Sequence, residues 1–185
     1  MSRPGRLVVI SGPSGVGKST LIQRLTRHPK CRLAVSATTR PPRPGEKDGV
    51  QYHFVTRSGF AEMADGGQLL EYADVHGARY GTPKAEVLPW LDQGWTVILD
   101  VDPQGFRAVR KVLSATGVFV MPPSIEALDA RLKGRATEDD AALARRLANA
   151  HAELACSGEY DHCIVNDDVA RALNEIELIT GLRNT

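Results

Sequence analysis

The chain has 185 residues, of which 42% are hydrophobic and 24% charged, and its formal net charge is +1. This length predicts one well-packed domain, and the near-neutral charge excludes an overall basic field for nucleic acid. With no apolar run of about eighteen residues and no apolar leader near Met1, we expect a cytoplasmic protein without a membrane partner.

The cysteines and histidines form no metal-binding or redox pattern. Cys31, Cys156 and Cys163 contain no C-x-x-C pair, so we expect small buried side chains in a reduced compartment. The five histidines share no metal-ligand spacing, which favours structural or surface roles. No obligate protein partner is evident from the sequence.

The first expected elements are a strand at Arg6–Ile10 and a helix that ends near Arg27. Between them, Gly12–Ser19 matches G-x-x-x-x-G-K-[ST], the phosphate-binding P-loop. Glycines let backbone N–H groups surround phosphate oxygens, Lys18 reaches the β- and γ-phosphates, and Ser19 is a ligand for Mg²⁺. The expected nucleotide-binding residues are Gly12, Pro13, Ser14, Gly15, Val16, Gly17, Lys18, Ser19 and Thr20.

A proline-rich segment follows a β-branched stretch. Leu33–Arg40 predicts a strand that opens into Pro41–Gly49. If the prolines hold a polyproline II conformation, Arg40 and Arg43 project on one side, roughly 9 Å apart, which suits an anion. Taken alone, the same composition is also typical of a flexible linker.

The next segments alternate between strand and helix patterns. Gln51–Val55 and Leu69–Val75 predict strands, and Ser58 is expected to cap a helix that runs to Asp65. Pro83 is expected to start a helix that reaches about Gln93.

A continuous apolar run at 95–99 predicts a central parallel strand that ends in Asp100 and Asp102. Ligands bind at the carboxyl edge of such sheets. Either aspartate orients Mg²⁺ through water, or engages an arginine or the substrate; the sequence leaves these roles open.

The second half continues the same alternation, which predicts a doubly wound α/β sheet. Ser124 is expected to cap a helix that carries Arg131 and Arg135, and Thr137–Asp140 resembles the capping box of the next helix, which carries Arg145 and Arg146. The remaining expected elements are helices at 103–113 and 169–182 and strands at 117–121 and 161–165.

Together these segments resemble the guanylate kinase family over nearly the whole chain. The most specific part is Val35–Glu46, followed by Gly49 and Tyr52. The resemblance implies a P-loop doubly wound parallel sheet core with a mobile GMP-binding segment and a helical lid. The implied core comprises 1–34, 83–124 and 157–185, the GMP-binding segment about 35–82, and the lid about 125–156.

The resemblance also implies roles for individual residues in binding GMP. Glu71 and Thr82 match the guanine-reading positions. A carboxylate accepts both N1–H and the N2 amine of guanine, and a hydroxyl donates to O6, whereas adenine lacks both donors on that edge. The implied phosphate ligands are Ser36, Arg40, Arg43, Tyr52 and Tyr80, with Glu46 steadying the arginines.

The implied reaction transfers the γ-phosphoryl group of ATP to GMP, with Mg²⁺ as cofactor. Lys18, Arg40, Arg135 and Arg146 are the implied catalytic residues, and Asn166 is placed at the adenine. Arg131 is a weaker match to the lid arginines, and Arg145 is equally compatible with a solvated position. No general base is required, because the second pKa of a phosphate monoester near 6 leaves a dianion at neutral pH.

Three alternatives remain at this stage. A non-catalytic guanylate-kinase-like interaction module predicts a damaged P-loop, but Gly17-Lys18-Ser19 is intact. A ribose 1,5-bisphosphate kinase on the same scaffold predicts the loss of the guanine-reading and phosphate-binding residues, but Arg40, Arg43, Glu71 and Thr82 are all present. A regulatory GTPase is disfavoured because the base-reading motif N-K-x-D is absent.

Overall fold

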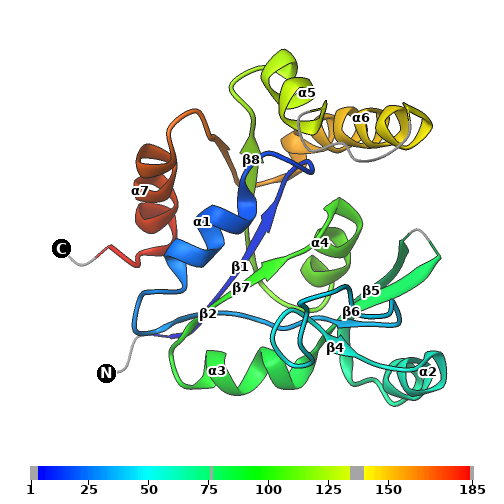
Figure 1. Ribbon diagram of the computed structural model, residues 1–185. Coiled ribbons are helices and arrows are strands. Elements are labelled where there is room, and N and C mark those ends of the chain that lie inside the picture. Colours follow the sequence, from blue (N-terminus) through cyan, green and yellow to red (C-terminus); the bar gives the residue numbers. More distant parts are fainter. Residues whose placement is uncertain (1–3, 76, 134–139, 184–185) are drawn as a thin grey trace.

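The computed structural model describes residues 4–75, 77–133 and 140–183. Within them, five strands form a parallel sheet in the order β2-β7-β1-β8-β9, with β1 at the centre (Figure 1). The strands are β1 (Arg6–Ser11), β2 (Cys31–Leu33), β7 (Thr96–Asp100), β8 (Thr116–Met121) and β9 (His162–Val165).

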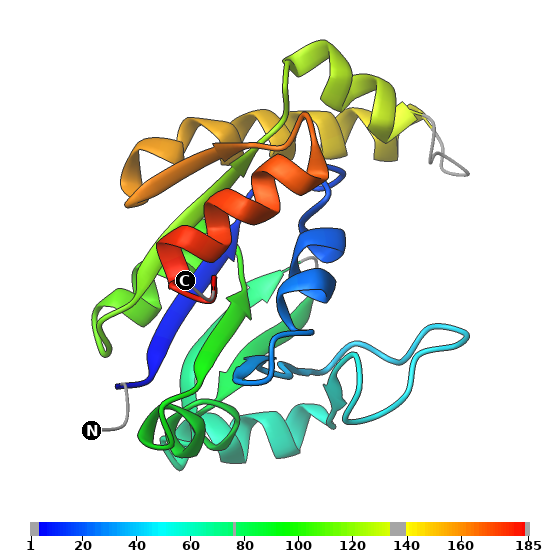
Figure 2. The ribbon, with the colours of Figure 1, turned by 90° about the vertical axis from the view of Figure 1, so that its left-hand side faces the viewer.

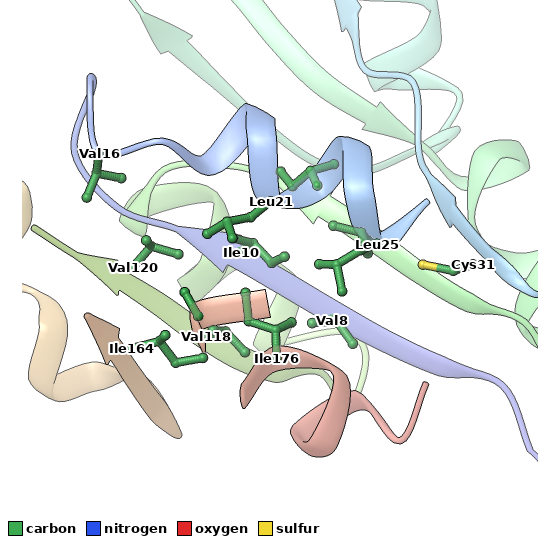
Figure 3. Close-up of a cluster of buried hydrophobic side chains, with 13 residues drawn as sticks. Val8, Ile10, Val16, Leu21, Leu25, Cys31, Val118, Val120, Ile164 and Ile176 are labelled. Carbon is green, nitrogen blue, oxygen red and sulfur yellow. The ribbon is translucent and has the colours of Figure 1, made fainter. Parts of the chain in front are cut away.

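Side chains of β1 alternate between two hydrophobic clusters because successive residues of a strand point to opposite faces. Val8 and Ile10 pack against α1 (Lys18–Leu25) and α7 (Val169–Thr180) (Figure 3). Leu7 and Val9 pack in the cluster formed with α3 (Leu88–Asp92) and α4 (Pro103–Arg110). Helices therefore cover both faces of the sheet, which confirms the doubly wound α/β architecture.

A smaller sheet lies at one end of the molecule, in the order β4-β3-β6-β5 (Figure 1). Its strands are β3 (Ala37–Thr38), β4 (His53–Phe54), β5 (Leu69–Val75) and β6 (Ala78–Pro83). The helix α2 (Arg57–Asp65) packs on it through Phe60, which is fully buried beside Ala37 and Leu69.

Two helices, α5 (Ile125–Lys133) and α6 (Asp140–Ala155), lie at the opposite end of the molecule (Figure 2). They pack on each other through Leu128, Leu132 and Ala150. Short 3₁₀ helices, η1 (Lys84–Glu86) and η2 (Ser157–Glu159), complete the described elements. Within the described residues, no helix combines the length and apolar character that a membrane crossing requires.

The expected single strand at Leu33–Arg40 is wrong. Its start is the end of β2 in the central sheet, and Ala34 still donates its N–H to the Ile98 carbonyl at 2.9 Å. The chain then crosses to the smaller sheet, where Ala37 and Thr38 pair with β4 and β6. Strand propensity alone does not distinguish one strand from two short strands in different sheets.

Several other expected boundaries also differ from the structure. Thr56, not Ser58, caps α2, because its hydroxyl accepts the N–H of Gly59 at 3.0 Å. The helix expected from Pro83 is interrupted: Pro83 ends β6 and is followed by η1 and α3. The P-loop helix α1 ends at Leu25 rather than near Arg27. The expected capping box at 137–140 lies largely outside the described residues.

Candidate functional site

The P-loop connects the central strand β1 to α1. Gly12, Gly15 and Gly17 adopt φ values of 144°, 84° and 100°, a region that side chains rarely adopt, so the loop depends on glycine. The Lys18 ammonium donates to the Gly12 carbonyl across the loop. A pocket at this loop is lined by Pro13, Ser14, Gly15, Gly17, Lys18, Ser19, Thr20 and Asp100.

Asn166 holds the other side of the P-loop. It is 4% exposed, and its Nδ2 donates to the Val16 carbonyl at 2.8 Å. A Cβ at Gly17 would lie 2.5 Å from that Nδ2, which gives Gly17 a second reason to lack a side chain. The buried Oδ1 of Asn166 meets no donor among the described residues. A neighbouring hollow is lined by Gly15, Gly17, Thr20, Arg131, Asn166, Asp167 and Val169.

A cavity of about 180 Å³ is formed between the carboxyl edge of the central sheet and the smaller sheet. It brings together residues from segments far apart in the chain, including most of the residues expected to bind the substrate. Its polar lining residues are Ser36, Tyr52, Glu71, Tyr80, Asp100 and Asp102.

Glu71 and Thr82 face each other across β5 and β6, where the strand register pairs them. Thr82 donates its hydroxyl proton to Glu71 Oε1 at 2.6 Å, and the two residues are 0% and 7% exposed, respectively. Burial raises the pKa of Glu71; the bond from Thr82 opposes this rise, and the charge of Asp102 adds to it. Gly105 leaves room for this carboxylate, because a Cβ there would lie 3.2 Å from Glu71 Oε2.

The Glu71–Thr82 bond refines the expectation for Thr82. A threonine hydroxyl has one proton, and here that proton is donated to Glu71. Donation to a base oxygen therefore requires the hydroxyl to turn away from Glu71. The same rotation frees a Glu71 lone pair for an incoming donor.

The two aspartates after β7 differ in their surroundings. Asp102 caps α4, accepting the N–H of Gly105 at 2.8 Å. Asp100 lines both the cavity and the P-loop pocket, so the two hollows are adjacent at its carboxylate. Asp100 is exposed to the cleft. The protein that surrounds it removes part of the water from its carboxylate, and this desolvation raises its pKa; the Lys18 charge opposes the rise.

Glu46 organises the proline-rich loop. Its two oxygens accept from the two terminal nitrogens of Arg40 at 2.9 Å each, and its Oε2 also accepts the N–H of Arg43 at 2.7 Å. The Arg40 guanidinium lies 5.4 Å from the centre of the Tyr52 ring, at the edge of the cavity. Arg43 is exposed, and the structure does not bring its side chain into the lining of the cavity.

The expected lid arginines have different surroundings. Arg131 lines the hollow beside Asn166. On α6, Arg146 is half-buried and Arg145 is exposed. Arg135 lies outside the described residues.

Two residues near the site were missed by sequence reasoning. Glu153 on α6 is half-buried; burial raises its pKa, which the Lys18 charge lowers and the charges of Asp102 and Asp100 raise. Nothing in the local pattern of α6 distinguishes it from a surface glutamate. Ser11 is 0% exposed and is the last residue of β1. A polar residue at the end of an apolar strand was the signal in the sequence that could have singled it out.

The cysteine expectation is only partly correct. Cys31 is buried, and burial raises its pKa to about 12, so it stays a neutral thiol. Cys163 is exposed, however, and Cys156 is half-buried. Cys163 lies in β9 at the edge of the sheet, and its side chain points to the face opposite that of its buried neighbour Ile164.

The sequence of this chain is similar to those of known proteins. The family described as guanylate kinase matches residues 4–180. Guanylate kinase of Synechococcus elongatus is 47% identical over 175 residues, 94% of this chain and 96% of the relative. The protein of the same name from Nocardia farcinica is 50% identical over 179 residues, 95% of this chain and 93% of the relative.

A solved structure is also similar to this chain. Guanylate kinase from Anaplasma phagocytophilum superposes with a TM-score of 0.78 and is 31% identical. The match covers 97% of this chain and 86% of the other. The likeness therefore extends over both sheets and the helical end of the molecule.

Proposed function

Because the chain belongs to the guanylate kinase family, we propose that it transfers the γ-phosphoryl group of ATP to GMP, releasing ADP and GDP. One observation carries the proposal. The cavity that holds the buried carboxylate of Glu71 adjoins the P-loop pocket, and Asp100 lines both. An acceptor bound in the cavity therefore lies beside a triphosphate bound at the P-loop, as in-line transfer requires.

Guanine binds against Glu71. The carboxylate accepts N1–H and the N2 amine, and Thr82 turns its hydroxyl from Glu71 to O6. Asp102, which lines the same cavity, is a second acceptor for the N2 amine. Adenine leaves this buried carboxylate unpaired, which disfavours AMP by factors of roughly 10⁴.

The GMP phosphate is held at the other end of the cavity. Ser36, Tyr52 and Tyr80 line the cavity and donate hydroxyl protons to phosphate oxygens. Arg40, oriented by Glu46, supplies a guanidinium fork that matches the phosphate geometry. Arg43 joins this group when the proline-rich loop closes over the ligand.

ATP binds with its phosphates in the P-loop. Lys18 exchanges its contact with the Gly12 carbonyl for the β- and γ-phosphates. The adenine enters the hollow that Asn166 lines beside the P-loop.

The residues present fit a hard, oxygen-binding cation at the P-loop. The Ser19 hydroxyl and the Asp100 carboxylate line one pocket, and both are oxygen donors. Within the described ranges no group of three His, Cys, Asp or Glu side chains is arranged to hold a metal, so phosphate oxygens of the bound nucleotide would have to supply further ligands to Mg²⁺. When bound, Mg²⁺ neutralises charge on the β- and γ-phosphates. Ser19 and Asp100 are the residues that would hold it.

The protein lowers the barrier by positioning and by charge. The phosphate of GMP attacks as a dianion and needs no proton acceptor. Two anions must approach each other, and Lys18, Arg40 and the lid arginines Arg135 and Arg146 neutralise their charge. We assign the GMP-binding segment to about 35–82, the lid to about 125–156 and the core to 1–34, 83–124 and 157–185, and closure of the two outer parts excludes water. The cytoplasmic location and the absence of an obligate partner remain predictions.

An ADP-release assay tests the reaction. Mg-ATP is combined in turn with GMP, dGMP, AMP, CMP, UMP and ribose 1,5-bisphosphate, and each measurement is repeated with EDTA. We expect strong turnover with GMP, weaker turnover with dGMP, almost none with the others, and loss of turnover on chelation. Turnover with the sugar phosphate alone would contradict the proposed substrate, and no turnover at all would contradict the proposed reaction.

A further inference from the structure

Ser11 makes a bond that continues the pairing of β1 with β7 beyond the backbone ladder. The parallel ladder ends with the pair Ile10 and Asp100. One residue further, the Ser11 hydroxyl donates to the Val101 carbonyl at 2.6 Å. Ser11 is 0% exposed, so this bond is shielded from water.

The acceptor of this bond lies between the two aspartates of the site. The Val101 carbonyl belongs to the peptide unit that joins Val101 to Asp102, so its direction sets where the Asp102 backbone begins. On the far side, Asp102 is tied to the N–H of Gly105 at 2.8 Å. Asp102 is thus held on two sides: the Ser11 bond fixes the peptide unit before it, and the Gly105 N–H fixes its carboxylate. Asp102 lines the cavity together with Asp100 and Glu71.

Tyr160 closes the space behind the same contact. Its ring stacks on Phe106 at 4.1 Å and meets Phe119 edge-on at 5.0 Å. Its hydroxyl is buried and has no hydrogen-bond partner among the described residues.

We infer that Ser11 is a positioning residue for the acceptor site: its bond to the Val101 carbonyl aligns Asp102, and with it the base-binding end of the cavity, for phosphoryl transfer to GMP. Ser11 touches neither substrate. This inference rests on the proposed function. A role limited to satisfying a buried carbonyl would affect stability alone.

The test compares Ser11→Ala with Thr180→Val. Thr180 is 1% exposed and donates its hydroxyl to the Ile176 carbonyl at 2.7 Å, a similar buried bond on α7. Both variants are expected to lower the midpoint of thermal unfolding. Only Ser11→Ala is expected to raise the KM for GMP, by about tenfold, with the KM for ATP within about twofold of wild type. Ser11→Cys, whose thiol is a weak donor, is measured against the same criterion if Ser11→Ala does not fold.

A double-variant cycle with Asp102→Asn separates positioning from an independent effect. If Ser11 acts through Asp102, adding Ser11→Ala to Asp102→Asn raises the KM for GMP little further. Additive effects, an unchanged KM for GMP, or an equal rise in the KM for ATP would overturn the inference. Wild-type turnover of GMP is measured first, so a failure of the proposed function is recognised separately from a failure of this inference.

Discussion

Glu71 shows how one buried residue couples specificity to stability. Burial raises its pKa, so the folded state holds the proton of this carboxyl to a higher pH than the unfolded chain does. The pKa of a glutamate in the unfolded chain is about 4.3. As the pH rises from that value to the higher pKa of Glu71 in the folded protein, the contribution of Glu71 to the free energy of unfolding decreases. Above that window the ionised carboxylate destabilises the free protein, and it is the form that guanine requires.

We expect Glu71→Gln to raise the KM for GMP and to reduce the preference for GMP over AMP by at least roughly tenfold, because an amide nitrogen faces the guanine donors. At pH 7 the midpoint of thermal unfolding should stay level or rise, since an unfavourable buried charge is removed. In wild type, the KM for GMP should increase as the pH falls through the raised pKa of Glu71.

Steady-state kinetics with both nucleotides and thermal melts measure these effects. The matched control is Glu62→Gln, the same chemical change at an exposed position of α2. An unchanged preference for GMP over AMP would remove Glu71 from base recognition.

At the scale of an element, the proline-rich loop is ordered by Glu46 rather than by regular secondary structure. One carboxylate engages the Arg40 guanidinium at two points and the Arg43 N–H at a third. The loop thus presents Arg40 in a defined orientation at the edge of the cavity. Preorganisation of this kind reduces the entropy lost on binding.

Glu46→Ala should raise the KM for GMP by roughly tenfold, with little change in the KM for ATP. The loss of orientation outweighs the removal of a negative charge near the phosphate, because that charge is already paired with Arg40. Glu175→Ala, which breaks an exposed Arg171–Glu175 pair on α7, is the control and should leave both constants unchanged. A lowered KM for GMP in Glu46→Ala would show that charge repulsion, not orientation, dominates.

At the scale of the whole molecule, Glu86 joins the two sheets. It pairs with Arg32 of β2 in the central sheet, and its Oε1 lies 3.0 Å from His53 Nε2 in β4 of the smaller sheet. The chain passes between the sheets at Val35, whose N–H points to the same carboxylate at 3.4 Å. Glu86 therefore fixes the position of the smaller sheet relative to the central sheet. The cavity that the smaller sheet lines is positioned with it, relative to the P-loop.

Glu86→Gln is expected to lower stability by roughly 1 kcal/mol and to raise the KM for GMP several-fold, without a matching change for ATP. The control is Glu177→Gln, which alters a similar pair with His28 at 2.9 Å within the core. Chemical denaturation and kinetics of both variants make the comparison. Equal KM values for GMP in the two variants would mean that the link has no part in positioning the smaller sheet.

The local chemistry of this protein was predictable from the sequence. The P-loop follows from residue order, since its glycines, Lys18 and Ser19 are neighbours in the chain. The alternation of helix and strand follows from hydrophobic periodicity, and the parallel sheet confirms it. Glu71 and Thr82 were singled out by their match to a family pattern rather than by spacing.

Only the tertiary structure decided which groups meet. Whether residues 33–40 form one strand or two depends on which sheet each part joins. The bond from Thr82 to Glu71 depends on the register of β5 and β6. The bond from Ser11 to Val101 joins residues 90 positions apart, and Glu153 of α6 lies within range of the Lys18 charge. The physical reason is that periodicity reports which face of an element is buried, whereas hydrogen bonds across elements depend on register and packing that no local pattern contains.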